Sequence, residues 1–185
     1  MTYKLDKLSV LIVEDMLPML TLTKSLLHIF GFRKIYTARD GVEGYNLYFN
    51  KQPDLIITDW HMDSMDGLDL IHKIRTDEDS PTPYIPIILM TGYSNQKRVE
   101  KARDNGMTEF LMKPYTAKDL CNKSVQLIEK PRTFVKCNGF IGPDRRRRVD
   151  AYDGPIRRTE DYYEAQDKEL KKAAEDIISK NKNKQ

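Results

Sequence analysis

The sequence predicts a doubly wound α/β fold built on a five-stranded parallel sheet. Over residues 7–130, five short apolar runs alternate with helix-forming segments. Strands that alternate with helices in this way pair in parallel, and right-handed crossovers then place helices on both faces of the sheet. The first run, residues 8–13, is almost wholly apolar, which is typical of a strand buried on both faces.

Each element has a local signal. The predicted strands are residues 8–13, 34–38, 54–58, 85–90 and 109–112. Apolar residues at helical spacing, bounded by polar or Gly/Pro breaks, predict helices at about 18–30, 42–50, 68–74, 95–104 and 117–129. Pro18 suits the first turn of the first helix, and Gly31 suits its end.

The pattern changes after Pro131. Residues 131–158 are rich in Pro, Gly and Arg and poor in large apolar residues, which predicts an extended basic linker. Residues 159–180 are helix-forming, and Tyr163, Leu170 and Ile177 recur every seven residues, so we expect an amphipathic helix. We expect residues 181–185 to be a disordered end.

Composition indicates a cytoplasmic protein with one domain and an appendage. The chain has 185 residues, and no apolar run approaches the roughly 20 residues that span a bilayer. The N-terminus lacks the apolar core of a secretory signal, and two cysteines, Cys121 and Cys137, make no disulfide framework. Residues 1–130 carry 17 basic and 18 acidic side chains, whereas residues 131–185 carry 14 and 10, so the excess positive charge lies in the tail.

Charged and hydroxyl side chains follow four of the predicted strands. Glu14 and Asp15 come after the first strand, Asp59 after the third, Thr91 after the fourth and Lys113 after the fifth. The carboxyl ends of parallel strands meet at one edge, where open α/β sheets bind ligands. Three carboxylates with hard oxygens suit Mg²⁺, and a lysine beside a hydroxyl suits phosphate oxygens. Taken alone, Glu14 and Asp15 have a second interpretation, as acidic residues that favour a nearby helix N-terminus.

These residues lie in four ordered motifs: V-E-D at 13–15, D-W-H-M-D-S-M-D-G at 59–67, M-T-G at 90–92 and M-K-P at 112–114. With these motifs the chain resembles the receiver domains of bacterial two-component response regulators. The resemblance covers about residues 7–130 and is to stand-alone, chemotaxis-regulator-like receivers, here with a basic C-terminal tail. It implies the flavodoxin-like receiver fold.

The resemblance also implies a role for each site residue. Asp59 would be the phospho-acceptor, and Lys113 and Thr91 would bind the phosphoryl group. The Mg²⁺ ligands would be Glu14, Asp15, Asp59 and the backbone carbonyl of His61. Thr91 and Phe110 would form the conformational switch, and His61 and Tyr93 would tune the lifetime of the phosphorylated state.

One position departs from the family pattern. Receivers usually have proline directly after the methionine of the acceptor loop, whereas Met62 is followed here by Asp63. The acceptor loop is therefore expected to be less rigid, but no catalytic group is lost.

The expected function is phosphorelay signalling rather than enzymatic turnover on an external substrate. The resemblance implies that a histidine kinase or a histidine phosphotransfer protein donates the phosphoryl group. Output would pass to a protein target through the fourth and fifth helices or the tail. Two alternatives stay open: nucleic-acid contact by the Arg145–Arg148 run, which interleaved acidic residues disfavour, and an unphosphorylated receiver-like interaction module.

Overall fold

The computed structural model describes residues 5–92, 96–137 and 140–144. A short 3-10 turn, η1, precedes a five-stranded parallel sheet, and a two-stranded antiparallel hairpin follows the last helix. The elements are η1 (Leu5–Lys7), β1 (Ser9–Val13), α1 (Leu17–Phe30), β2 (Lys34–Ala38), α2 (Gly41–Lys51), β3 (Leu55–Asp59), α3 (Gly67–Thr76), β4 (Ile87–Thr91), α4 (Gln96–Asp104), β5 (Glu109–Met112), α5 (Ala117–Glu129), β6 (Phe134–Cys137) and β7 (Phe140–Pro143).

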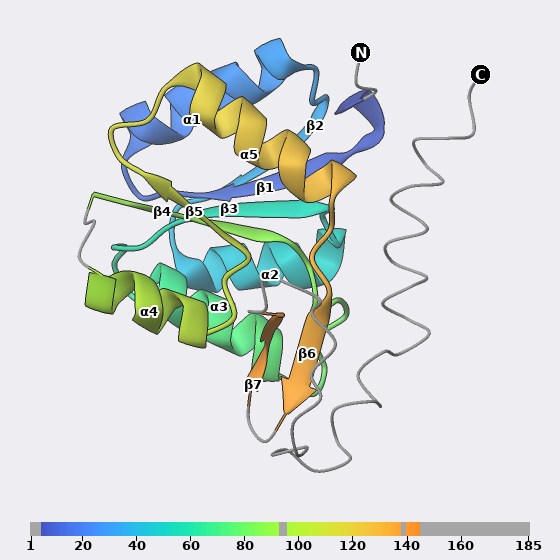
Figure 1. Cartoon of the computed structure of the whole chain (residues 1–185). Helices are drawn as coiled ribbons and strands as arrows, with labels where there is room; N and C mark the ends of the chain where they lie inside the picture. The colour runs from blue at the N-terminus through green and yellow to red at the C-terminus, as the bar shows by residue number, and fades with distance from the viewer. Residues whose placement is uncertain (1–4, 93–95, 138–139, 145–185) are drawn as a thin grey trace.

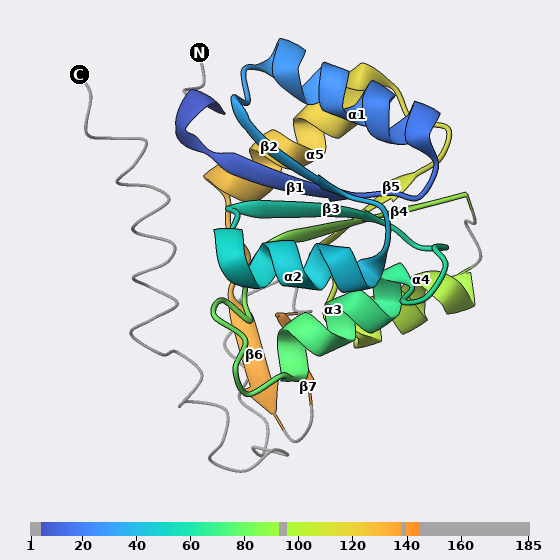
Figure 2. The same cartoon turned by 180° about the vertical axis from the view of Figure 1, so that it is seen from behind.

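The sheet confirms the predicted fold class. Its strand order is β2-β1-β3-β4-β5, with every neighbouring pair parallel. In Figure 1, α1 and α5 cover one face while α2, α3 and α4 cover the other, and Figure 2 shows the same layers from behind. β1, β3 and β4 are buried along their whole length because helices cover both of their faces.

Two apolar layers hold the helices on the sheet. Leu27 of α1 and Leu120 of α5 lie in the layer on one face, and Leu70 and Ile71 of α3 lie in the layer on the other. Alternate residues along each central strand feed the two layers, as the two-residue period of a strand requires. None of the helices in the described part of the chain is long and apolar enough to cross a bilayer.

The helix ends are determined locally. Pro18 lies in the first turn of α1, and Gly31 ends that helix with a left-handed φ of 106° while its N–H donates to the carbonyl of His28. Asp40 and Asp66 accept backbone hydrogen bonds at the starts of α2 and α3, and Thr116 opens α5. The sequence signals at Pro18 and Gly31 therefore locate the ends of α1.

The prediction of an extended linker is wrong for residues 134–137 and 140–143. These residues form the two strands of the β6–β7 hairpin, in which Phe134 pairs with Pro143 and Cys137 pairs with Phe140. Figure 1 shows the hairpin below the sheet, on the side of α3 and α4. The strands are only four residues long, and their burial depends on contact with the domain, so composition gave no strand signal. The predicted helix at 159–180 and the end at 181–185 lie outside the described residues.

The loop between β3 and α3 turns back tightly onto the end of β3. Gly67, the first residue of α3, donates its N–H to the carbonyl of Trp60 at 2.8 Å. A Cβ atom at Gly67 would overlap the carbonyl oxygen of Asp59. Glycine is required at this position because the loop backbone and the strand end approach each other too closely for a side chain.

Replacing Gly67 with alanine is therefore expected to destabilise the protein. Alanine gains about 1 kcal/mol of helix propensity, but overpacking against the backbone at Asp59 costs about 3 kcal/mol, so the net change is a loss. Urea unfolding of the full chain measures it. Gly92→Ala is the matched control, since a Cβ there meets no atom within 4 Å. Equal unfolding midpoints for Gly67→Ala and the unmodified protein would contradict the expectation.

Candidate functional site

Four strand ends converge at one edge of the sheet. Asp59 ends β3 beside Met90, and Thr91 ends β4 beside Met112. The backbone ladder continues past the strands, since Glu14 N–H donates to the Ala38 carbonyl at 3.1 Å and Lys113 N–H donates to the Thr91 carbonyl at 2.7 Å. The residues that follow β1 and β5 are therefore held in register with the ends of their neighbours.

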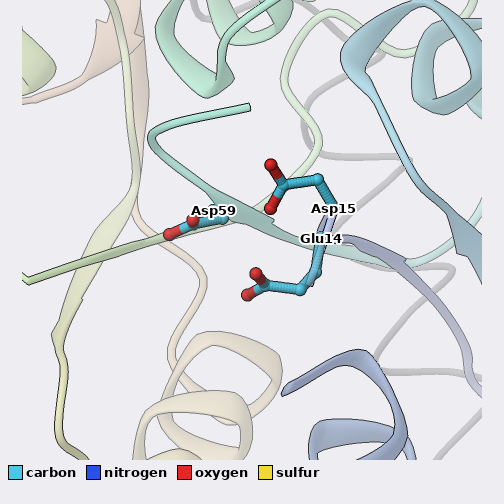
Figure 3. A group of neighbouring side chains, drawn as sticks. All are labelled: Glu14, Asp15 and Asp59. Carbon is cyan, nitrogen blue, oxygen red and sulfur yellow. The ribbon is translucent and has the colours of Figure 1, made fainter. Parts of the chain in front are cut away.

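Three carboxylates gather at this edge. Glu14, Asp15 and Asp59 each offer an oxygen within 4.8 Å of the other two, and Figure 3 shows the three side chains where β1 and β3 end. Glu14 is fully buried, Asp59 is 9% exposed and Asp15 is half-buried. Carboxylate oxygens at this spacing suit a hard divalent cation, and Mg²⁺ is a usual choice where only part of the coordination shell comes from protein. The residues present therefore fit a magnesium ion.

Lys113 links two of the carboxylates. Its Nζ lies 2.8 Å from Oε2 of Glu14 and 2.9 Å from Oδ1 of Asp59. Its side chain is only 19% exposed, so water screens these ion pairs weakly. The ammonium group thus joins the ends of β1, β3 and β5 at the centre of the site.

The site carries more negative charge than Lys113 neutralises. Burial raises the pKa of Glu14, and Asp59 raises it further, although the hydrogen bond from Lys113 opposes both effects. Burial would lower the pKa of Lys113, but its hydrogen bonds to Glu14 and Asp59 outweigh burial and raise it. Lys113 is therefore held protonated, while a charged Glu14 is unfavourable until further positive charge arrives.

Arg39 is a site neighbour that the sequence reasoning missed. It follows β2, and its guanidinium donates to the backbone carbonyl of Asp15 at 2.8 Å. The backbone N–H of Arg39 donates to the carboxylate of Glu43 at 2.8 Å, and this bond fixes the β2–α2 connection to the first turn of α2. The rule that located the other residues, polar side chains directly after a strand, would have found Arg39 if it had been applied to β2.

Thr91 and Phe110, the residues predicted to form the switch, lie on the neighbouring strands β4 and β5. Thr91 is buried at the end of β4, at the same edge of the sheet as the carboxylates. Phe110 on β5 is half-buried, pairs with Leu89 and packs against the layer that contains α3. Their movement on phosphorylation stays a prediction.

The two residues predicted to tune lifetime are placed differently. His61 is exposed at the start of the loop after β3, and its ring stacks on that of the buried Trp60 with centroids 6.0 Å apart. Tyr93 lies outside the described residues.

Backbone hydrogen bonds hold the acceptor loop where the family usually has proline. Asp63 is exposed, and its carbonyl accepts from Met65 N–H at 2.9 Å. The Met65 carbonyl in turn accepts from Gly41 N–H at 3.2 Å, and Ser64 has a left-handed φ of 67°. The bond to Gly41 ties the loop to the start of α2 without the proline.

Comparison with known proteins gives the family. The sequence profile of the response regulator receiver domain matches residues 10–124. The chemotaxis protein CheY-3 of Vibrio cholerae is 30% identical over 123 residues, which are 66% of this chain and 93% of that protein. The profile match ends before the β6–β7 hairpin.

Solved structures agree. The receiver domain of a signal transduction histidine kinase from Syntrophus aciditrophicus superposes with a TM-score of 0.61 at 27% identity, covering 71% of this chain and 97% of the other. The receiver domain of a sensor histidine kinase from Pseudomonas aeruginosa gives a TM-score of 0.57 at 26% identity, covering 64% and 94%, and was solved with a magnesium ion coordinated in its active site cleft. The chain therefore belongs to the response regulator receiver domain family and is similar to the chemotaxis regulators within it.

Proposed function

We propose that this receiver accepts a phosphoryl group on Asp59 from a histidine kinase or a histidine phosphotransfer protein. The observation that carries the proposal is the pairing of one half-buried lysine, Lys113, with two carboxylates beside a third. Such a cluster has an oxygen nucleophile, a cation for phosphate oxygens and a set of oxygen ligands for a divalent metal within one site.

The chemistry assigned to the chain's own residues is a single transfer. A carboxylate oxygen of Asp59 attacks phosphorus in line, the bond from phosphorus to the donor imidazole nitrogen breaks, and an acyl phosphate forms. Lys113 already contacts Asp59 Oδ1, so a short shift brings its ammonium onto the new phosphoryl oxygens. Thr91, buried at the same edge, is assigned as a hydroxyl donor to those oxygens.

Magnesium is the cofactor proposed for this reaction. Glu14, Asp15, Asp59 and the backbone carbonyl of His61 are the residues assigned to hold it. When bound, it neutralises phosphoryl oxygens during transfer. The magnesium ion in the Pseudomonas aeruginosa receiver supports this assignment.

The proposed output is a phosphorylation-dependent protein contact. The acyl phosphate carries about 1.5 to 2 negative charges at the end of β3, where the Asp59 carboxylate carried one, and it adds phosphoryl oxygens that accept hydrogen bonds. Thr91 then has a new acceptor, and Phe110 takes the space that Thr91 leaves. α4, β5 and α5 flank these two residues, so the target is expected to read that surface or the C-terminal tail. The Arg145–Arg148 run, on which the nucleic-acid alternative rests, lies outside the described residues.

Asp59→Asn is expected to abolish phosphorylation, because the amide is not a nucleophile for the transfer. Full-length protein is incubated with acetyl phosphate and Mg²⁺, and intact mass is measured. Asp63→Asn, which changes an exposed carboxylate in the same loop, is the matched control and keeps the mass gain of one phosphoryl group. An undiminished gain in Asp59→Asn would reject Asp59 as the acceptor.

Glu14→Gln is expected to stabilise the fold without metal and to weaken its response to metal. The pKa of Glu14 is raised, so its charged form is unfavourable in the folded state, and a neutral amide of the same shape removes that cost. We expect the variant without metal to unfold at a higher temperature than the unmodified protein at neutral pH. Thermal unfolding with and without Mg²⁺ is the measurement.

The control for that experiment is Glu78→Gln, an exposed carboxylate in the α3–β4 connection. It should leave both the stability and the magnesium response unchanged. A Glu14→Gln variant that is less stable than the unmodified protein, yet equally stabilised by Mg²⁺, would remove Glu14 from the proposed metal site.

Replacing His61 and Tyr93 together with alanine is expected to shorten the life of the acyl phosphate severalfold. Both side chains are assigned to border the approach of the hydrolytic water. The decay of the phosphorylated mass after removal of acetyl phosphate, at fixed Mg²⁺, reports the rate. His72→Ala on the exposed face of α3 is the control. A decay that is unchanged or slower shows that neither residue shields the site.

A further inference from the structure

Arg75 near the end of α3 is a buried cation without a carboxylate partner among the described residues. Its side chain is 1% exposed. The guanidinium donates instead to three backbone carbonyls, those of Pro83 at 2.6 Å, Ile85 at 2.8 Å and Gly106 at 3.0 Å. Burial lowers the pKa of Arg75 to about 9, so the group is still protonated at neutral pH. Arg75 thus joins α3, the α3–β4 connection and the α4–β5 connection through one side chain.

The β6–β7 hairpin covers this arginine. The ring of Phe134 lies with its centroid 5.0 Å from Cζ of Arg75 and meets the ring of Tyr84 edge-on at 5.7 Å. Phe134 is only 4% exposed. An aromatic face over a desolvated guanidinium is attractive, and it excludes the water that would otherwise hydrate the charge. The hairpin therefore completes the burial of Arg75.

The hairpin also touches the segment that leads into β5. A Cβ atom at Gly106 would overlap the carbonyl oxygen of Ile141, and a Cβ at Gly142 would lie 3.0 Å from the Gly106 Cα. Gly106 itself has a left-handed φ of 87°. Figure 1 and Figure 2 both show β7 beside α3. Two glycines thus let the backbone of β7 lie directly on the α4–β5 turn.

The start of β5 is held from several sides. Oγ1 of Thr108 accepts from Ile87 N–H at 3.0 Å, and the Thr108 N–H donates to the Ile87 carbonyl at 3.1 Å. At the next residue, Glu109 pairs with Lys123 of α5 at 3.0 Å and with Arg132, just before β6, at 3.4 Å. Residues 106–109 are therefore fixed to β4, α5 and the hairpin, whereas Phe110 and Lys113 are held to β4 by backbone pairing.

We propose that the β6–β7 hairpin is an intramolecular brace that fixes the start of β5 through Arg75 and Gly106. This inference rests on the proposed function in one respect: it confines the phosphorylation-driven change to the part of β5 from Phe110 onward. The hairpin lies at the amino-terminal ends of β4 and β5, away from the carboxylates, so it acts on the fold rather than on the reacting groups. It also extends the folded unit past residue 130, to include residues up to 144.

Hydrogen exchange of the full chain tests the brace. The reporters are the backbone N–H groups of Met107 and Thr108, which donate to the carbonyls of Ala102 and Ile87. In the unmodified protein we expect both N–H groups to exchange slowly, and we expect acetyl phosphate with Mg²⁺ to leave their exchange rates unchanged. In Phe134→Ala we expect exchange about tenfold faster at both positions, because the cover over Arg75 is lost. In this variant we also expect phosphorylation to change the exchange rates of both N–H groups.

Two further variants make the result decisive. Lys136→Ala changes an exposed residue of β6 and should behave as the unmodified protein. Gly142→Val presses a side chain against the Phe140 ring and the Gly106 backbone, so it should loosen the same two reporters if Phe134→Ala unfolds too far to be measured. Exchange at Met107 and Thr108 that matches the unmodified protein in a folded variant, in both states, would overturn the brace.

Intact mass separates this outcome from a failure of the proposed function. If no phosphoryl group is taken up, the proposed function fails, while the comparison without acetyl phosphate still decides whether the hairpin holds the α4–β5 turn. If the group is taken up and the unmodified protein changes at Met107 and Thr108 as strongly as Phe134→Ala does, the brace is wrong.

Discussion

The ammonium group of Lys113, set between the carboxylates of Glu14 and Asp59, is the interaction on which the site depends. Two like charges about 4 Å apart near a protein surface repel by about 4 kcal/mol, and burial makes the cost of each charge larger. One lysine offsets part of that repulsion and leaves the cluster with an excess of negative charge. The cluster therefore holds together in the fold and still favours a further cation.

The same interaction ties the sheet to the chemistry. Lys113 comes from the end of β5 at the edge of the sheet, and Glu14 comes from the end of β1, with β3 and β4 between these two strands in the sheet. Lys113 reaches both carboxylates because the parallel pairing of β1, β3, β4 and β5 places their carboxyl ends at the same edge of the sheet. Any change in the position of β5 therefore moves Lys113, which connects the site to the surface around that strand.

A second cation, the fully buried Arg75, lies at the other end of the sheet and donates to a different kind of acceptor. Arg75 has five N–H donors in a fixed plane, and backbone carbonyls from two connections accept from them. Carbonyls carry no net charge, so this site has no excess negative charge and no affinity for a metal. Lys113 thus leaves carboxylate oxygens that a ligand can use, whereas Arg75 donates to neutral carbonyls that join two connections.

The sequence alone determined the sheet, the order of its helices and the residues at the strand ends. Apolar runs a few residues long, each followed by a polar residue, are local signals, and parallel pairing brings their ends together whatever the details of packing. The hairpin, the burial of Arg75 and the contact of Arg39 with Asp15 were decided only by the tertiary structure. Phe134 contacts Arg75, and Gly142 lies close to Gly106, although each pair is distant in the chain. A local sequence pattern cannot predict a contact between residues that are so far apart.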